Sequence, residues 1–257
     1  RTTNDVVERW SEPVRAFEPV VEELPEPTSA RITMTLRIGN DPDPRNVVID
    51  LFGDQAPNTV ASFLDLVRDG YYTGTQAHHL EDASYMIFGD PTTREGIGPA
   101  VGTGHPGFDL PVEPTNTYTF GSATGTERFG EEADGRGRLA MLRPTQAGRP
   151  VPPGDASAAL PGRSHGSQFL LSLAPLPEFD NWTDASGRRV ELTQLGQVIQ
   201  GLDVLTLLVL QQTGQSIKGY VPPLDPIVID AITIEQGIDI DGELAARIPR
   251  VPSSPDV

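Results

Sequence analysis

The four histidines of this chain are the residues best suited to proton transfer or metal binding. His78 and His79 are adjacent and stand just before two carboxylates. Neighbouring side chains on a strand point to opposite faces, so this pair would make a poor set of metal ligands. His105 and His165 lie far apart, in glycine-rich segments. We therefore expect neither a metal site nor a cofactor.

Three carboxylates, Asp90, Asp109 and Glu113, could form a pair for acid–base chemistry. However, the chain holds 36 Asp and Glu against 19 Lys and Arg, a formal net charge of −17. In a chain with so many acidic residues, the presence of carboxylates at these three positions is better explained by chance than by a catalytic role. The glycine-rich stretch 96–107 lacks the lysine of a phosphate-binding loop. These patterns do not predict hydrolysis or phosphoryl transfer.

Charge and composition exclude several classes of function. A strongly negative chain repels nucleic-acid phosphates and anionic membrane surfaces. Because the chain has no cysteine, it can form no disulfide and no cysteine-ligated metal site. No apolar run approaches the roughly 20 residues of a membrane-spanning helix. The compartment stays open, but we favour export to a periplasm or organelle lumen, since the chain is acidic, has one lysine and does not begin with methionine.

The apolar pattern predicts a mainly β structure. Apolar residues alternate with polar ones at 32–38 and 47–51, which is typical of half-buried strands, and the apolar segment 227–234 is predicted to be a last strand. Further short apolar segments lie between these strands, separated by turns rich in glycine and proline. Apolar spacings of three and four predict two helices, at 57–68 and 201–211. The pattern therefore indicates an all-β sandwich or barrel with two helices.

We expect one main domain, residues 30–236, with an extension at each end. Residues 1–29 combine a weak helical pattern with a linker, and residues 237–257 form an irregular acidic tail. Two polar stretches rich in glycine and proline, at about 91–116 and 143–163, are predicted to be loop insertions. The N-terminal extension has an apolar face but no core of its own, so it should pack on the domain or on a partner.

Six blocks of the sequence resemble, in order and spacing, the cyclophilin-type peptidyl-prolyl isomerases. Residues 47–78, with VVIDLF and APNTVASFLDLVRDGYYTG, follow the family's first strand, helix and histidine. The remaining blocks are GRLAM at 137–141, GSQFL at 166–170, EFD at 178–180 with QLGQVIQ at 194–200, the helical segment 202–208, and the closing strand 226–234. The resemblance implies an eight-stranded antiparallel barrel capped by two α-helices. It also implies rotation about X–Pro bonds, without metal or cofactor.

The resemblance also implies which residues form the substrate site and which of them differ from the residues usual in the family. The family arginine that donates near the prolyl nitrogen is replaced by His79, which is shorter, lacks the planar fork and is mostly neutral at pH 7. Gln168 matches a site glutamine that is retained. A family phenylalanine and tryptophan give way to Ser84 and Glu178. The residues expected to bind substrate are Tyr85, Ile87, Met141, Leu170 and Phe179.

Two functions are compatible with this altered site. In the first, the chain is a protein-binding or structural subunit of a larger assembly and contacts that assembly through its two extensions. Its isomerase activity is then weak or absent. In the second, it is an active prolyl isomerase with a remodelled site, in which Arg143 or Arg163 takes the place of the missing arginine. In both, the partner is a protein or a proline-containing peptide. The replaced site residues favour the first.

Overall fold

The computed structural model describes residues 30–113, 120, 136–145, 150–151, 160–180, 182–183, 187, 189–236 and 251–252. Its main feature is an antiparallel sheet with the strand order β12–β1–β2–β11–β6–β10–β4–β3. The strands are β1 (Arg31–Ile38), β2 (Arg45–Leu51), β3 (His79–Glu81), β4 (Tyr85–Phe88), β6 (Arg138–Met141), β10 (Phe169–Ser172), β11 (Gln194–Gln200) and β12 (Ile227–Gln236).

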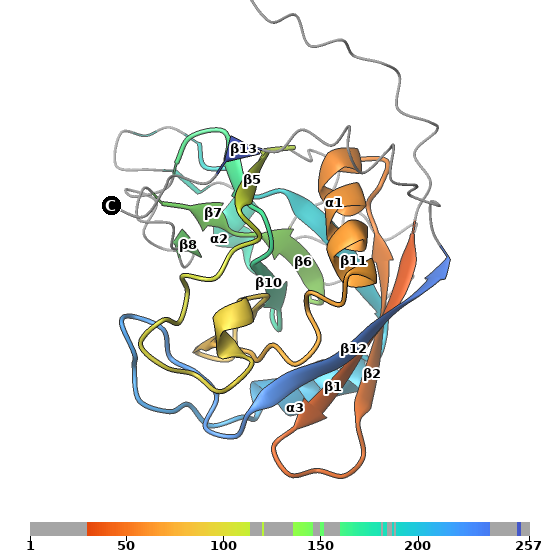
Figure 1. Ribbon diagram of the computed structural model, residues 1–257, viewed down its shortest axis with the longest axis vertical. Helices are drawn as coiled ribbons and strands as arrows, with labels where there is room; N and C mark the ends of the chain where they lie inside the picture. Colours follow the sequence, from red (N-terminus) through yellow and green to blue (C-terminus); the bar gives the residue numbers. More distant parts are fainter. Residues whose placement is uncertain are drawn as a thin grey trace, which may run out of the picture.

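The sheet is strongly curved (Figure 1), and hydrogen bonds connect its two edges. The segment just before β3 hydrogen-bonds to β12: the amide of Ala77 donates to the carbonyl of Ile227 at 2.8 Å, and the amide of Ile229 donates to the carbonyl of Thr75 at 2.9 Å. The expected eight-stranded antiparallel architecture is therefore confirmed.

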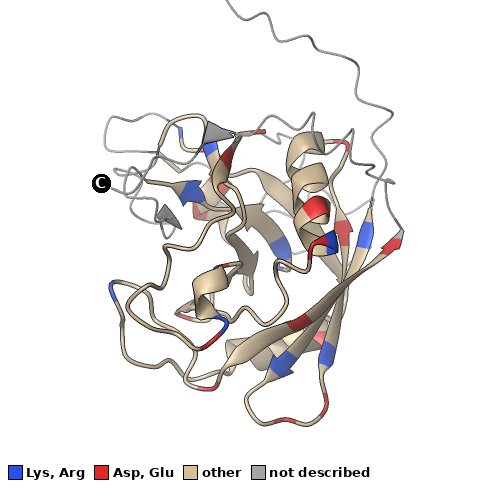
Figure 2. Ribbon diagram, viewed as in Figure 1, with Lys and Arg blue, Asp and Glu red and all other residues tan. Residues whose placement is uncertain are grey.

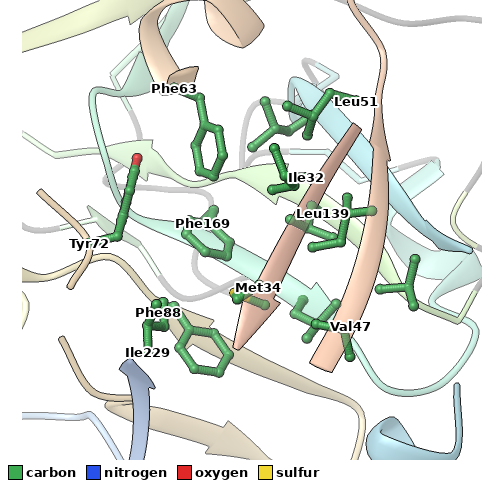
Figure 3. Close-up of a cluster of buried hydrophobic side chains, with 14 of the residues drawn as sticks. Ile32, Met34, Val47, Leu51, Phe63, Tyr72, Phe88, Leu139, Phe169 and Ile229 are labelled. Carbon is green, nitrogen blue, oxygen red and sulfur yellow. The ribbon is translucent and has the colours of Figure 1, made fainter. Parts of the chain in front are cut away.

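In the long strands, the apolar residues that alternate with polar ones in the sequence point into the core. In β1 every second residue is buried, and Met34 lies opposite Val47 of β2. Across the barrel, Leu139 of β6 and Phe169 of β10 complete the same cluster of buried side chains (Figure 3). A shift of one residue in any of these strands would expose its apolar set, so this pattern determines which face is buried.

Both predicted helices are present, and a third was missed. In α1 (Pro57–Arg68) the apolar spacing places Phe63 against the core, 5.8 Å from the ring of Phe169. The second is α3 (Leu202–Val209), which ends slightly before the predicted limit. The unpredicted α2 (Pro177–Asp180) has only four residues, which is too short for a helical period to show. None of the helices in the described part of the chain could cross a membrane.

The two stretches expected to be loops contain short strands and one turn of 3-10 helix, η2 (Pro91–Thr93). The strand β5 (Phe108–Pro111) pairs with both β9 (Arg163–His165) and β13 (Val251–Pro252), and β7 (Arg143–Pro144) pairs with β8 (Pro150–Val151). Strands of two to four residues show no periodicity of their own, because distant partners create them. The helical pattern predicted in residues 1–29 lies outside the described residues, as does most of the tail 237–257.

A residue distant in the sequence caps the start of α1. Ala56, at the N-cap position, offers no side-chain hydrogen bond. The carboxylate of Glu113 instead accepts from the backbone amides of Asn58 and Thr59, at 3.1 and 2.8 Å, and from both of their side chains. The amide of Glu113 in turn donates to the hydroxyl of Thr193 at 3.0 Å. One carboxylate thus ties the first helix to the segment that carries β5.

Charged residues lie on strands, on loops and on α1 (Figure 2). Arg31 pairs with Asp50 across β1 and β2 at 2.6 Å, and Arg37 pairs with Asp230 across β1 and β12 at 3.0 Å. Such partly exposed pairs typically contribute about 0–1 kcal/mol each. They support strand register rather than form a reactive centre.

Candidate functional site

His79 is the first residue of β3, and His78 directly precedes it. Because neighbouring residues of an extended chain point to opposite faces, the two rings lie in different surroundings. The ring of His79 is 3% exposed. Its Nδ1 accepts a hydrogen bond from the amide of Val221 at 3.0 Å, so in the neutral ring Nε2 carries the proton and donates to Glu81 Oε2 at 2.9 Å. Burial lowers the pKa of His79, although Glu81 opposes this. Both ring nitrogens are therefore engaged within the protein.

The side chain of Gln168, the other predicted catalytic residue, is also fully engaged. Its Oε1 lies 3.1 Å from His78 Nε2, and its Nε2 donates to the carbonyls of Gly102 and Gly104 at 3.3 and 2.7 Å. The amide must point this way, because both glycine partners are acceptors. Gln168 thus clamps the 98–107 loop to the barrel. On the other side of that loop, Asp90 accepts from the amide of Gly102.

Replacing Gln168 with leucine is expected to loosen this loop. The change leaves the Gly102 and Gly104 carbonyls and the His78 donor without their partner, which costs roughly 2–3 kcal/mol of unfolding free energy. Urea unfolding and amide exchange at residues 101–104 would measure the effect. The matched control is Gln212→Leu at an exposed position. Equal stability and equal exchange in the two variants would contradict the clamp.

The two candidate replacement arginines are held elsewhere. The guanidinium group of Arg143 donates to the carbonyls of Glu191 and Leu160, both at 2.7 Å. Arg163, on β9, lies 3.5 Å from the carboxylate of Asp109. None of these three partners is among the residues expected to bind substrate.

Four of the five residues predicted to bind substrate come together on the outer face of the sheet, away from the barrel core. Tyr85 and Ile87 come from β4, Leu170 from β10, and Phe179 from α2. Ile87 and Leu170 are paired directly across the strands. We call the whole set the outer cluster; it comprises Tyr85, Ile87, Phe120, Ala140, Leu142, Leu170, Leu176, Phe179 and Leu192, with Trp182 packed against it.

Met141 is the exception among the predicted residues. It belongs to the barrel core, pairs with Phe169 and is 1% exposed. Adjacent residues of a strand face opposite sides, so Ala140 and Leu142 reach the outer cluster while Met141 does not. The alternation along this segment thus places Leu142, and not Met141, in the outer cluster.

Side chains of the chain itself cover the outer cluster. Ile87, Leu142 and Leu170 are all fully buried. The ring of Phe120 lies edge-on to that of Phe179 at 5.6 Å, and Phe179 lies 5.9 Å from Tyr85. Phe120, Leu176 and Leu192 were not predicted from the sequence, because no periodic pattern connects them to the strands they cover.

Across the described residues, no group of three or more histidines and carboxylates is placed to hold a metal ion. The third buried histidine, His165, is held by backbone groups. His165 Nδ1 accepts from the amides of Ser167 and Gln168 at 3.1 and 2.9 Å. The site therefore consists of neutral rings, backbone groups and an apolar surface.

Comparison with known proteins identifies the family. The family model described as "Cyclophilin type peptidyl-prolyl cis-trans isomerase/CLD" matches residues 33–234. The chain belongs to this family. It is 31% identical over 169 residues to peptidyl-prolyl cis-trans isomerase-like 1 of Rhizopus delemar, covering 65% of this chain and 76% of that protein. It is 27% identical to peptidyl-prolyl cis-trans isomerase B of Escherichia coli, covering 74% of this chain and 94% of that protein.

Solved cyclophilin structures share the fold. A cyclophilin-type isomerase of Cryptosporidium parvum superposes with a TM-score of 0.54 at 22% identity, covering 82% of this chain and all of that one. The Mimivirus cyclophilin gives a TM-score of 0.52 at 20% identity, covering 84% and 95% of the two chains. At these identities the likeness concerns the cyclophilin fold alone, so the function must be argued from this chain's own residues.

Proposed function

We propose that this cyclophilin binds protein segments as a structural or adaptor subunit, and that its isomerase activity is weak or absent. One observation carries the proposal: the residue at the family arginine position, His79, has both ring nitrogens bound to Val221 and Glu81. Its partner would be a protein or a proline-containing peptide, and contacts with a larger assembly would involve residues 1–29 and 237–257.

The hydrogen bonds of the His79 ring matter because catalysis of peptide-bond rotation needs a free donor. The barrier to rotation about a peptide bond is about 18–20 kcal/mol. An enzyme lowers it by binding the twisted amide better than the planar one, which requires a donor aimed at the atom where charge develops. His79 would have to release Val221 or Glu81 before donating to a substrate. Gln168 would have to release the 98–107 loop.

A direct assay of the full chain tests the proposal. Isomerisation of an Ala-Ala-Pro-Phe peptide would be followed by NMR exchange, with the Escherichia coli relative measured alongside as the control. Removing one preorganised donor costs on the order of 10²–10³ in rate, so we expect kcat/KM at least about a hundredfold below that control. A value within about tenfold would refute the impaired site. It would instead favour an active isomerase with a remodelled site, as the names of the relatives suggest.

A further inference from the structure

The segment 211–224, which we call the arm, forms a hairpin of its own in the blue loop between α3 and β12 (Figure 1). Backbone pairing joins its two sides, and near the tip Ile217 and Tyr220 exchange both of their hydrogen bonds, at 2.8 and 3.0 Å. Between them, Lys218 and Gly219 both have a positive φ, as in a tight hairpin turn. Because these bonds lie within the arm, it can move as one unit.

The arm contacts the barrel through Tyr220 and Val221. The amide of Leu80, in the edge strand β3, donates to the carbonyl of Val221 at 2.8 Å, and the amide of Val221 donates to His79 Nδ1 at 3.0 Å. The ring of Tyr220 is 3% exposed and lies 6.0 Å from the ring of His79. It also packs on Gly102, where a β-carbon would come within 2.3 Å of the ring. The arm therefore closes over β3 and His79 together.

One of these contacts depends on the protonation state of His79. Nδ1 accepts from the amide of Val221 only while the ring is neutral, because an imidazolium ion carries a proton on both nitrogens. Protonation would therefore set two donors against each other across 3.0 Å. The compensation on the other nitrogen is small, since the side chain of Glu81 is 48% exposed and exposed ion pairs contribute little. The closed arm thus disfavours the charged ring.

The groups that face the His79 ring come from three elements. Burial lowers the pKa of His79, and Glu81 of the same strand opposes this. The ring of Tyr85 in β4 lies at 5.8 Å and that of Tyr220 in the arm at 6.0 Å. Phenols ionise near pH 10, and burial raises the pKa of Tyr85 further. The neighbouring His78 has a pKa lowered by burial to about 4, so of these groups only Glu81 is charged near pH 6.

We propose that the arm is a latch on the candidate site, which stays closed while His79 is neutral and opens when Nδ1 takes up a proton. The inference rests on the closed site of the proposed function and names its regulation. In the open state the ring carries a positive charge and an Nδ1 donor that no longer faces Val221, at the position of the family arginine. The closed arm protects the amides of Leu80 and Val221, so their hydrogen exchange measures its opening.

Amide exchange of the full chain tests the latch, followed by NMR at pH 7 and pH 5.5 and corrected for the intrinsic pH dependence of exchange. If the open arm leaves His79 with an ordinary pKa of about 6.5, opening should increase about eightfold between these two pH values. The amides of Leu80 and Val221 should show this increase. At both pH values they should exchange faster than the amide of Met141, which donates to Thr193 in the barrel. Protection equal to that of Met141 would mean that the arm opens only when the whole fold does, which would overturn the latch.

Two variants identify the proton and the contact. His79→Asn can keep an acceptor for the amide of Val221 but takes up no proton, so the eightfold increase should disappear, and an unchanged increase would overturn the role of His79. Tyr220→Ala removes the ring that packs on His79 and should increase opening at pH 7 by about 10- to 100-fold. Ser216→Ala, at an exposed position of the arm, is the matched control. Equal exchange in these last two variants would also contradict the latch.

The latch and the proposed function are judged by different measurements. The isomerisation rate of the wild type at pH 7 decides the proposed function, whereas amide exchange involves no turnover. If Tyr220→Ala fails to fold, the wild type and His79→Asn still decide whether the arm opens with the proton.

Discussion

Lowering the pH from 7 to 5 is expected to reduce the free energy of unfolding by about 4 kcal/mol, because two buried histidines stay neutral in the fold. Burial lowers the pKa of His78 to about 4, against an opposing effect of Asp90. Burial also lowers the pKa of His165 to about 3, and the neighbouring His105 and His78 rings act in the same direction. In the unfolded chain both return to about 6.5.

The direction of the effect follows from which state binds the proton. Between pH 6.5 and pH 4 the unfolded chain takes up protons at His78 and His165 and the folded chain does not, so stability falls as the pH falls. At pH 5, one and a half units below the unfolded pKa, each histidine contributes about 2 kcal/mol to the loss. Above about pH 7 their contribution to stability is complete.

Urea unfolding at pH 7, 6 and 5 would measure this slope. His165→Asn can keep an acceptor for the amides of Ser167 and Gln168, and it should halve the loss to about 2 kcal/mol. Gln215→Asn, at an exposed position, is the control and should leave the slope unchanged. A wild-type stability that is flat from pH 7 to pH 5 would show that these rings are not held neutral.

Replacing Glu113 with alanine is expected to lower the free energy of unfolding by about 3 kcal/mol. The carboxylate accepts from two backbone amides and two side chains at the start of α1. Hydrogen bonds to a charged group each contribute about 1.5–3 kcal/mol, partly offset here by water reaching the exposed amides. The negative charge also interacts favourably with the positive end of the helix dipole.

Chemical denaturation of three variants separates these contributions. Glu113→Gln keeps one acceptor oxygen but loses the charge, so it should cost about half as much as Glu113→Ala. Glu95→Ala removes an exposed carboxylate and is the matched control. If Glu113→Ala were no more destabilising than Glu95→Ala, the cap would contribute nothing and α1 would be held by its apolar face alone.

Most of the barrel could be predicted from the sequence, because the alternation of buried residues is a property of each strand's own residues. The period of two in β1 and β2, and the helical spacing in α1, indicate which side chains enter the core. The order of the motifs then implied the cyclophilin fold, and the structure confirms it. The same alternation could have separated Leu142 from Met141.

The state of the site was decided only by tertiary structure. The amide that binds His79 Nδ1 belongs to Val221, 142 residues away, and Phe120, which covers part of the outer cluster, is bound by Asp180, 60 residues away. The short strands of the inserted segments likewise exist only through distant partners. The resemblance predicted that His79 takes the place of the family arginine. Its partner Glu81 is two residues away, whereas the amide of Val221 reaches Nδ1 only because the fold brings distant segments together, which no local pattern records.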